Sequence, residues 1–212
     1  MAKTKKYYIL MADIIKSSQK KGAPLMHEFS EIVDSVKQRR QEDFLSPPTI
    51  TLGDEFQSVI KDLAAAVQVM LAIEEEIIIK RKSFKLRYVL HYGEIETPIN
   101  PEIAWGMLGT GLATARNLLE ELKGRRTERF FLLLEDAEKD AVLNKIFFLY
   151  SAVIDDWKTK DAETLSLFLQ YPDYKVVAEK LQKDRSLLWR KEKTLRLREY
   201  NTAKALVTLL GK

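Results

Sequence analysis

The chain has 212 residues, enough for one large domain or for a medium domain followed by a small one. Its hydrophobic fraction of 46% and charged fraction of 31% are ordinary for a soluble globular protein, and the lack of cysteine excludes disulfides, thiolate zinc sites and cysteine nucleophiles. The longest apolar stretch, Ile146 to Ile154, is too short to span a membrane, and the basic N-terminus lacks the uncharged core of a signal peptide. We therefore expect a cytoplasmic protein.

The positive charge of the chain is concentrated near its C-terminus. The formal net charge is +4, but between Tyr171 and Lys204 there are ten Lys and Arg against five Asp and Glu, a net charge of +5. This excess favours a polyanion as the partner of the C-terminal region, although a solvated helical surface would show the same excess.

The first half of the chain alternates between strand-type and helix-type patterns. Tyr7 to Ile15 is a near-continuous apolar run, typical of a central strand buried on both faces. Apolar residues at helical spacing predict a helix over about Pro24 to Gln41. The further elements expected in this half are a hairpin over Thr49 to Ile60 after Pro47-Pro48, a helix over Leu63 to Ile79 and a strand over Lys85 to Tyr92.

The next two elements complete the pattern of the sheet domain. We predict a helix over Gly109 to Lys123, closed by Gly124, and a strand over Arg129 to Leu134. The resulting order, β-α-β-β-α-β-α-β, is typical of a ferredoxin-like split βαβ unit with an added helix and strand. The prediction is an α+β fold: a ferredoxin-like βαββαβ domain at residues 1–157, followed by a small helical domain at residues 158–212.

Two acids are candidates for a metal site in this sheet. Asp13 ends the first strand, and Asp54 lies in the Gly53-Asp54 turn of the hairpin, which glycine favours because it reaches φ > 0 without steric cost. The predicted topology places the end of the first strand beside the hairpin turn, so the two carboxylates would meet at one sheet edge. Carboxylate oxygens are preferred ligands of Mg²⁺ and Mn²⁺. The alternative is that Asp13 is a buried acid capping the next loop and that Asp54 and Glu55 are only turn residues.

The polar loop after Asp13 is a candidate phosphate site. Lys16, Ser17 and Ser18 could bind phosphate through their side chains and backbone N–H groups, although such a run is also typical of a solvated loop. Trp105, in an irregular segment after the fourth strand, is expected in the core or at a dimer interface, and the alternative is a platform on which a base stacks.

The C-terminal region shows the pattern of a helix-turn-helix between Tyr174 and Lys191. Val177, Ala178 and Leu181 would form the inner face of the first helix, and Leu188 would anchor the second. Gln182 occupies the turn position where glycine is commonest. The side chains predicted to face DNA are Arg185, Ser186, Trp189 and Arg190.

A final helix, from about Arg196 to Leu210, would close this small bundle. Its contacts are expected through Leu197, Ala203, Leu206 and Leu209. The alternative is a helical bundle used only for dimerisation or packing.

Four segments resemble the class III nucleotidyl cyclases. The segment from Ala12 to Ser18 is similar to their first metal-binding segment, and Leu52 to Phe56 is similar to their hairpin and to the GGDEF signature of diguanylate cyclases. Leu86 to Glu94 resembles the cyclase strand that ends in Gly-Glu, and Gly109 to Arg116 lies where cyclases carry an asparagine-to-arginine helix.

With the helix-turn-helix, this combination most closely resembles the SatD family. The resemblance implies that Asp13 and Asp54 hold Mg²⁺ or Mn²⁺, with help from the Ile14 carbonyl and Glu55. It also implies that Arg116, the candidate catalytic group, stabilises phosphate charge. The implied partners are a nucleoside triphosphate or signalling nucleotide, DNA, and a second copy of the chain, because cyclase-type sites are generally completed by two chains. Arg116 could equally be a surface ion-pair partner.

The chain also departs from the cyclase pattern. The lysine that reads adenine corresponds to Ile50, the catalytic asparagine corresponds to Leu112, and Leu52 replaces the second glycine of GGDEF. These departures favour a nucleotide-binding, DNA-binding regulator. The alternatives are an active metal-dependent nucleotidyl cyclase or nucleotidyltransferase, and a scaffold in which both acids are structural.

Overall fold

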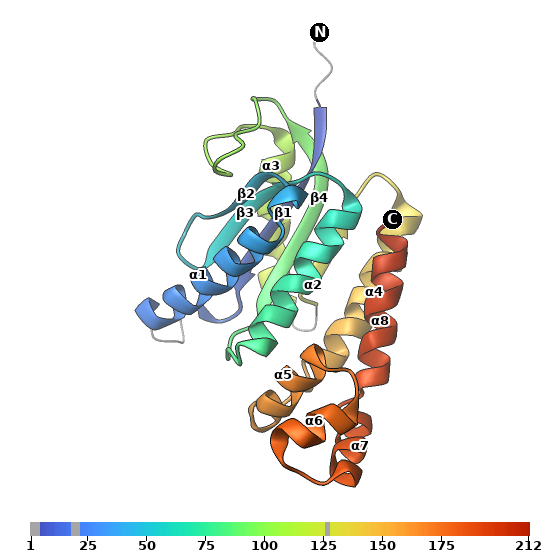
Figure 1. The fold of residues 1–212 in the computed structure, drawn as a ribbon. Helices are drawn as coiled ribbons and strands as arrows, with labels where there is room; N and C mark the ends of the chain where they lie inside the picture. The colour runs from blue at the N-terminus through green and yellow to red at the C-terminus, as the bar shows by residue number, and fades with distance from the viewer. Residues whose placement is uncertain (1–4, 18–21, 126–127) are drawn as a thin grey trace.

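The computed structural model describes residues 5–17, 22–125 and 128–212, and within them the chain forms a five-stranded sheet with helices on both faces and a C-terminal group of helices (Figure 1). The strands are β1 (Lys5–Ile14), β2 (Phe44–Ile50), β3 (Glu55–Ile60), β4 (Leu86–Ile95) and β5 (Phe130–Leu133). The helices are α1 (Gly22–Arg39), α2 (Leu63–Ile79), α3 (Thr110–Lys123), α4 (Ala137–Ile154), α5 (Ala162–Gln170), α6 (Tyr174–Leu181), α7 (Arg185–Thr194) and α8 (Leu197–Leu210), with 3-10 turns at Gln41–Asp43 and Thr159–Asp161.

The sheet has the strand order β2-β3-β1-β4-β5, with β1 at its centre. β1 pairs antiparallel with β3 and with β4, and β5 pairs parallel with β4. The side chains of Ile9 to Ala12 are completely buried, as expected for a strand covered on both faces. The fold is therefore mixed α+β, with its strands and helices in the predicted order along the chain.

Each face of the sheet has its own hydrophobic core. Leu10, Ala12 and Phe56 point to the face covered by α1, α2 and α4. Figure 1 shows α1 and α2 in front of the sheet. Ile9 and Met11 point to the other face, which is covered by α3 and by the segment from residue 96 to 109. The period-two alternation of a strand places successive side chains in different cores.

Two strands differ from the prediction. β2 begins at Phe44, so Pro47 and Pro48 lie inside a strand and not before it. β2 is an edge strand with two register shifts against β3, and a residue without an N–H is tolerated there because one side of the strand needs no partner. β4 extends beyond the predicted end at Tyr92, through Gly93 to Ile95. Gly93 allows close packing against α3, because a Cβ atom on it would lie 2.7 Å from the Cα of Gly111.

The C-terminal helices divide between two cores. α5, α6 and α7 enclose a small core that includes Val177, Ala178 and Leu188. α8 runs beside α4 in the opposite direction (Figure 1), and its Tyr200, Ala203 and Val207 join the core of the sheet domain.

The predicted role of the last helix is therefore wrong in part. Of the four residues expected to close the small bundle, Leu197 does so, Ala203 packs on the sheet domain, and Leu206 and Leu209 are exposed. Within the described ranges, no helix combines the length and the hydropathy needed to cross a membrane.

Candidate functional site

The end of β1 and the β2–β3 turn meet at one edge of the sheet. The Ile14 N–H donates to the Asp54 carbonyl oxygen at 2.9 Å, and Asp13 lies opposite Glu55 in β3 and Arg87 in β4. The antiparallel register forces this arrangement because β1 ends where β3 and β4 begin. The first strand and the hairpin turn therefore come together as the sequence predicted.

Asp13 is buried and lies between two basic residues. Asp13 is only 4% exposed. Arg87 Nη1 donates to its Oδ1 at 3.1 Å and to its Oδ2 at 2.8 Å. Lys123 Nζ, from the last turn of α3, lies 3.7 Å from Oδ2. Burial raises the pKa of Asp13 to about 6, against the opposing effect of Arg87 and Lys123 and with a smaller contribution from Asp54 and Glu55.

The two acids of the hairpin have different partners. Asp54 Oδ2 accepts a hydrogen bond of 2.5 Å from Ser17 Oγ, which fixes the loop after β1 onto the turn. Glu55 begins β3 and is only 2% exposed, so it belongs to the sheet and not to the turn. Arg116 Nη2 lies 3.0 Å from Glu55 Oε1, and Thr51 Oγ1 donates to the same oxygen at 3.3 Å.

The remaining predicted residues lie close by or outside the described part of the chain. Ile14 has its side chain in the core, and Lys16 has a left-handed backbone conformation with φ of 58° at the turn after β1. Ser17 contacts Asp54, whereas Ser18 lies outside the described residues. Arg116 is held by an ion pair, which is the alternative that the sequence left open, but the acid that it pairs with is one of the proposed metal ligands.

Sequence reasoning missed Arg87 and Lys123. Arg87 faces Asp13 because the two are register partners, and Lys123 reaches the site from the C-terminal turn of α3. The position of Arg87 near the start of a strand that pairs with β1 was the available signal. The cluster therefore contains three acids and three bases, which are Asp13, Asp54, Glu55, Arg87, Arg116 and Lys123.

The second candidate site is the pair of helices α6 and α7. α6 ends at Gln182, whose left-handed backbone (φ 52°) makes the turn, and the Asp184 carboxylate caps α7 by accepting from the Ser186 and Leu187 N–H groups. The four side chains predicted to face DNA, Arg185, Ser186, Trp189 and Arg190, are all exposed, whereas Leu188 is buried in the small core. Lys193 Nζ lies 3.6 Å from the centre of the Trp189 ring, which adds a positive charge to the same surface.

A comparison with protein families gives one match, to the SatD family, over residues 7–209. The chain belongs to the SatD family. No curated protein matches the sequence.

Solved structures similar to this SatD-family protein include three nucleotidyl cyclases. A bacterial light-regulated adenylyl cyclase has 16% identity and a TM-score of 0.47, over 61% of this chain and 76% of that chain. The catalytic core of a rhodopsin-guanylyl cyclase with converted specificity, in complex with ATPalphaS, has 20% identity and a TM-score of 0.42, over 55% and 72%. The guanylate cyclase domain of RhGC from Catenaria anguillulae, in complex with GTP, has 19% identity and a TM-score of 0.39, over 55% and 73%.

The acids of this SatD-family protein fit a metal ion that arrives with a nucleotide better than a metal held by protein alone. Among the described residues, no group of three or more His, Cys, Asp or Glu side chains is arranged to hold a metal. Mg²⁺, however, usually uses only one or two carboxylates and takes its other ligands from water and substrate phosphates. Asp13 and Asp54 are two carboxylates whose backbones adjoin through the hydrogen bond from the Ile14 N–H to the Asp54 carbonyl.

Proposed function

We propose that this SatD-family protein is a cytoplasmic regulator whose sheet domain binds a nucleoside triphosphate or signalling nucleotide with Mg²⁺ or Mn²⁺, and whose α6–α7 pair binds DNA. The observation that carries the proposal is the convergence of Asp13, Asp54 and Glu55 with Arg116 at one sheet edge. A site that holds both signs of charge can contact the metal and the phosphates of the same ligand.

Each residue has a separate role in this proposal. Asp13 and Asp54 hold the metal, with the Ile14 carbonyl and Glu55 as further oxygen ligands. The bound metal neutralises phosphate charge. Arg116 and the loop of Lys16, Ser17 and Ser18 bind the phosphate oxygens, and Arg87 and Lys123 add positive charge beside Asp13.

The strand order supports a ferredoxin-like, cyclase-like sheet. The four strands β2-β3-β1-β4 have antiparallel neighbours throughout, as two interleaved βαβ units require. The positions expected to read a base and to act on a hydroxyl are apolar, since Ile50 packs at the edge of one core and Leu112 is buried in the other. These contacts favour binding over catalysis.

Exposed apolar residues on the hairpin and on the segment from residue 96 to 109 support a homodimer. Trp105 is 56% exposed, so the expectation of a core position for it is wrong and the interface interpretation remains. Ile103 and Leu108 in the same segment, and Leu52 at the hairpin, are also exposed. The Gln57 side chain donates to the Ala104 carbonyl at 3.0 Å, which holds this segment against β3. Exposed apolar residues of this size are typical of an interface.

Isothermal titration calorimetry with ATP and with GTP, each with Mg²⁺, tests the nucleotide site. We expect binding to the wild type, loss of at least about tenfold in affinity in Asp54→Asn, and an unchanged affinity in Asp34→Asn, which makes the same change on the exposed face of α1. If neither nucleotide binds, the proposed nucleotide site is refuted.

Duplex DNA titrations at several salt concentrations test whether the α6–α7 pair binds DNA. Replacing Arg185 and Arg190 by alanine removes two expected phosphate or base contacts and should lower the salt slope of log K by about 2. Lys139→Ala with Lys145→Ala on α4 removes the same charge elsewhere and should leave the slope unchanged. Equal slopes in the two double variants would exclude α7 as the DNA surface.

The alternative is an active nucleotidyl cyclase or nucleotidyltransferase. The observation that favours it is that Arg116 lies beside Glu55 in the acid cluster and not on a remote surface. Incubation with each nucleoside triphosphate and Mn²⁺, followed by chromatography, separates the two functions. A cyclic or linked product that disappears in Asp54→Asn supports the enzyme, and unchanged nucleotide supports the regulator.

A further inference from the structure

A second pocket lies on the opposite face of the sheet from the acid cluster. It has a cavity volume of about 150 Å³ and is formed by the C-terminal end of α2, the segment before β4, and the segment that joins α4 to α5. Its lining includes Ile77 and Phe84, which belong to the core on the α2 and α4 side of the sheet. The acid cluster instead contains Arg116 and Lys123 of α3, which covers the other face. It is therefore distinct from the proposed nucleotide site.

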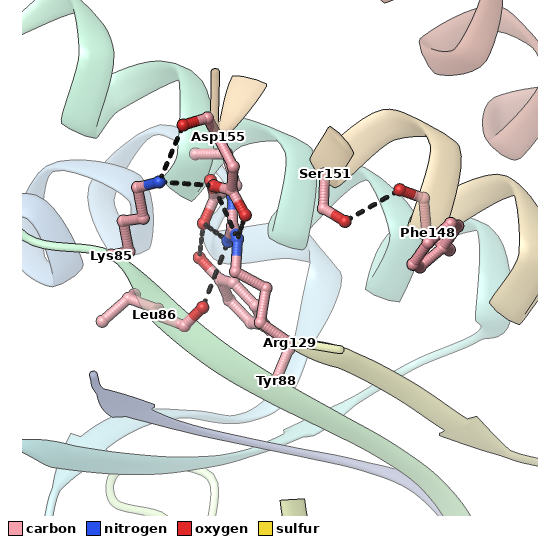
Figure 2. A network of polar contacts seen from close by, with 8 residues as sticks. Lys85, Leu86, Tyr88, Arg129, Phe148, Ser151 and Asp155 are labelled. Carbon is pink, nitrogen blue, oxygen red and sulfur yellow. Dashed lines mark hydrogen bonds and ion pairs between the residues drawn. The ribbon is translucent and has the colours of Figure 1, made fainter. Parts of the chain in front are cut away.

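The pocket has an apolar wall and a charged base. Ile77, Phe84, Trp157 and Leu165 supply the wall. At the base, the Arg129 guanidinium forms two hydrogen bonds with the Glu74 carboxylate, at 2.9 and 2.8 Å. Its Nε also donates to both oxygens of Asp155, and Figure 2 shows Arg129 beside Asp155 and Lys85. A volume of this size admits a body of about one benzene ring.

The rim of the pocket carries an excess of positive charge. Arg81, Lys82, Lys85 and Lys158 line it, and its only acidic lining residues are Glu74 and Asp155. Both acids are already engaged, Glu74 by Arg129 and Asp155 by Arg129 and Lys85. Lys82 is paired with Glu31 at 2.9 Å, and Arg81 forms a longer ion pair of 3.7 Å with Glu163, whereas Lys158 forms no ion pair within the described part of the chain.

Arg81 occupies a backbone position that favours glycine. The Lys82 N–H donates to the Ile77 carbonyl and the Arg81 N–H donates to the Ile78 carbonyl, which is the pattern of a Schellman motif at the end of α2. In that motif the residue with left-handed backbone is usually glycine, yet Arg81 adopts φ of 56°. The chain therefore keeps a guanidinium at the pocket in an unfavourable backbone conformation.

We propose that this pocket binds a small organic anion, with a ring-sized apolar body against Trp157 and Leu165 and a carboxylate or phosphate group at Arg81 and Lys158. The occupant lies between the two functional parts of the chain. The Lys85 carbonyl accepts from the Ile15 N–H just after Asp13, and the Trp157 indole donates to the Leu195 carbonyl at 2.8 Å between α7 and α8. The proposal does not depend on nucleotide binding at the acid cluster.

Calorimetric titration of the full chain, without nucleotide or metal, tests this site. The probes are phenyl phosphate and benzoate, with inorganic phosphate and benzylamine as comparisons that lack the ring or reverse the charge. We expect at least one aromatic anion to bind, and both comparison compounds to bind at least about tenfold more weakly. Which of the two anions binds more tightly identifies the anionic group.

Two variants locate the binding. Arg81→Gly removes the guanidinium but places the preferred residue in the left-handed position, so it should fold at least as stably as the wild type while its affinity falls about tenfold. Lys158→Ala, at an exposed position, should also weaken binding. Gln182→Gly also places glycine at a left-handed position, at the end of α6, and should bind the anions as tightly as the wild type does. Equal binding of benzylamine or inorganic phosphate, absence of binding by both aromatic anions at millimolar concentration, or unchanged affinity in Arg81→Gly and Lys158→Ala would overturn the proposal.

Discussion

Replacing Arg129 by methionine should be among the most destabilising single changes in the sheet domain. Arg129 is only 5% exposed and donates to the Glu74 carboxylate, the Asp155 carboxylate and the Leu86 carbonyl. Burial alone would lower the pKa of Arg129, but the ion pairs with Glu74 and Asp155 raise it above its usual value. The guanidinium is therefore charged in the folded protein.

The expected cost follows from what the substitution leaves behind. Glu74 is only 4% exposed and would keep a single partner, the Tyr88 hydroxyl at 2.8 Å, for a buried negative charge. Asp155 is partly exposed and keeps the Lys85 ammonium at 3.0 Å. Breaking a buried ion pair by removing one partner costs roughly 3–5 kcal/mol, and most of that cost should come from Glu74.

Arg125 provides a matched control. Arg125 also forms an ion pair, at 2.9 Å with Glu128, and lies over the Phe131 ring as Arg129 lies over Phe130. The side chains of Arg125 and Glu128 are both exposed. Arg125→Met should therefore change the free energy of unfolding by less than about 1 kcal/mol.

Urea unfolding followed by far-UV circular dichroism at pH 7 measures both substitutions. Adding Glu74→Leu to Arg129→Met should restore much of the lost stability, because the double variant buries no unpaired charge. Similar losses in Arg129→Met and Arg125→Met, or a further loss in the double variant, would refute the reasoning.

Two further changes test the two candidate sites. Without metal, the pKa of Asp13 is about 6 in the folded protein against an ordinary value of 3.8, so the wild type should lose about 1–3 kcal/mol of stability relative to Asp13→Asn as the pH rises from 4 to 7. Urea titrations across that range check it, and a pH-independent difference contradicts it. Gln182→Gly should stabilise the α6–α7 turn by about 1 kcal/mol because φ is 52° there, which thermal unfolding would show as a higher Tm; an unchanged or lower Tm would contradict it.

Most of the elements could be predicted because their patterns are local. α2 begins and ends at the predicted residues, Leu63 and Ile79, and Asp62 marks its start locally because its carboxylate accepts from the Ala65 N–H. The start of β2 at Phe44 could not be predicted, because Pro47 and Pro48 are tolerated only in an edge strand. The position of a strand in a sheet depends on residues far away in sequence.

The last helix shows what periodicity leaves open. Tyr200, Ala203 and Val207 lie on one face of α8 with helical spacing, which predicts a buried stripe but not the surface that covers it. The hydroxyl of Tyr200 donates to Glu75 Oε1 of α2 at 2.5 Å, and Lys204 forms an ion pair with the same carboxylate. α8 follows α7 directly in sequence, yet these contacts place it against the sheet domain.

The acids of the candidate site and Arg116 could be named from the sequence, whereas Arg87 and Lys123 could not. Asp13 and Asp54 could be brought together because strand order alone places the end of β1 beside the hairpin turn. Arg87 and Lys123 could not, because their approach depends on the β1–β4 register and on the angle at which α3 crosses the sheet. One residue of slip would turn Arg87 to the opposite face.

These basic partners change what the acids can do. Arg87 donates to both oxygens of Asp13, so a metal ion at Asp13 must displace a guanidinium or share the carboxylate with it. A phosphate group offers that guanidinium another anion, which a free metal ion does not. With three acids and three bases in one partly buried cluster, a nucleotide alone adds a large negative charge, and a metal ion bound with it offsets part of that charge. The contacts of Arg87 therefore favour a metal that enters with its nucleotide over one that is permanently bound.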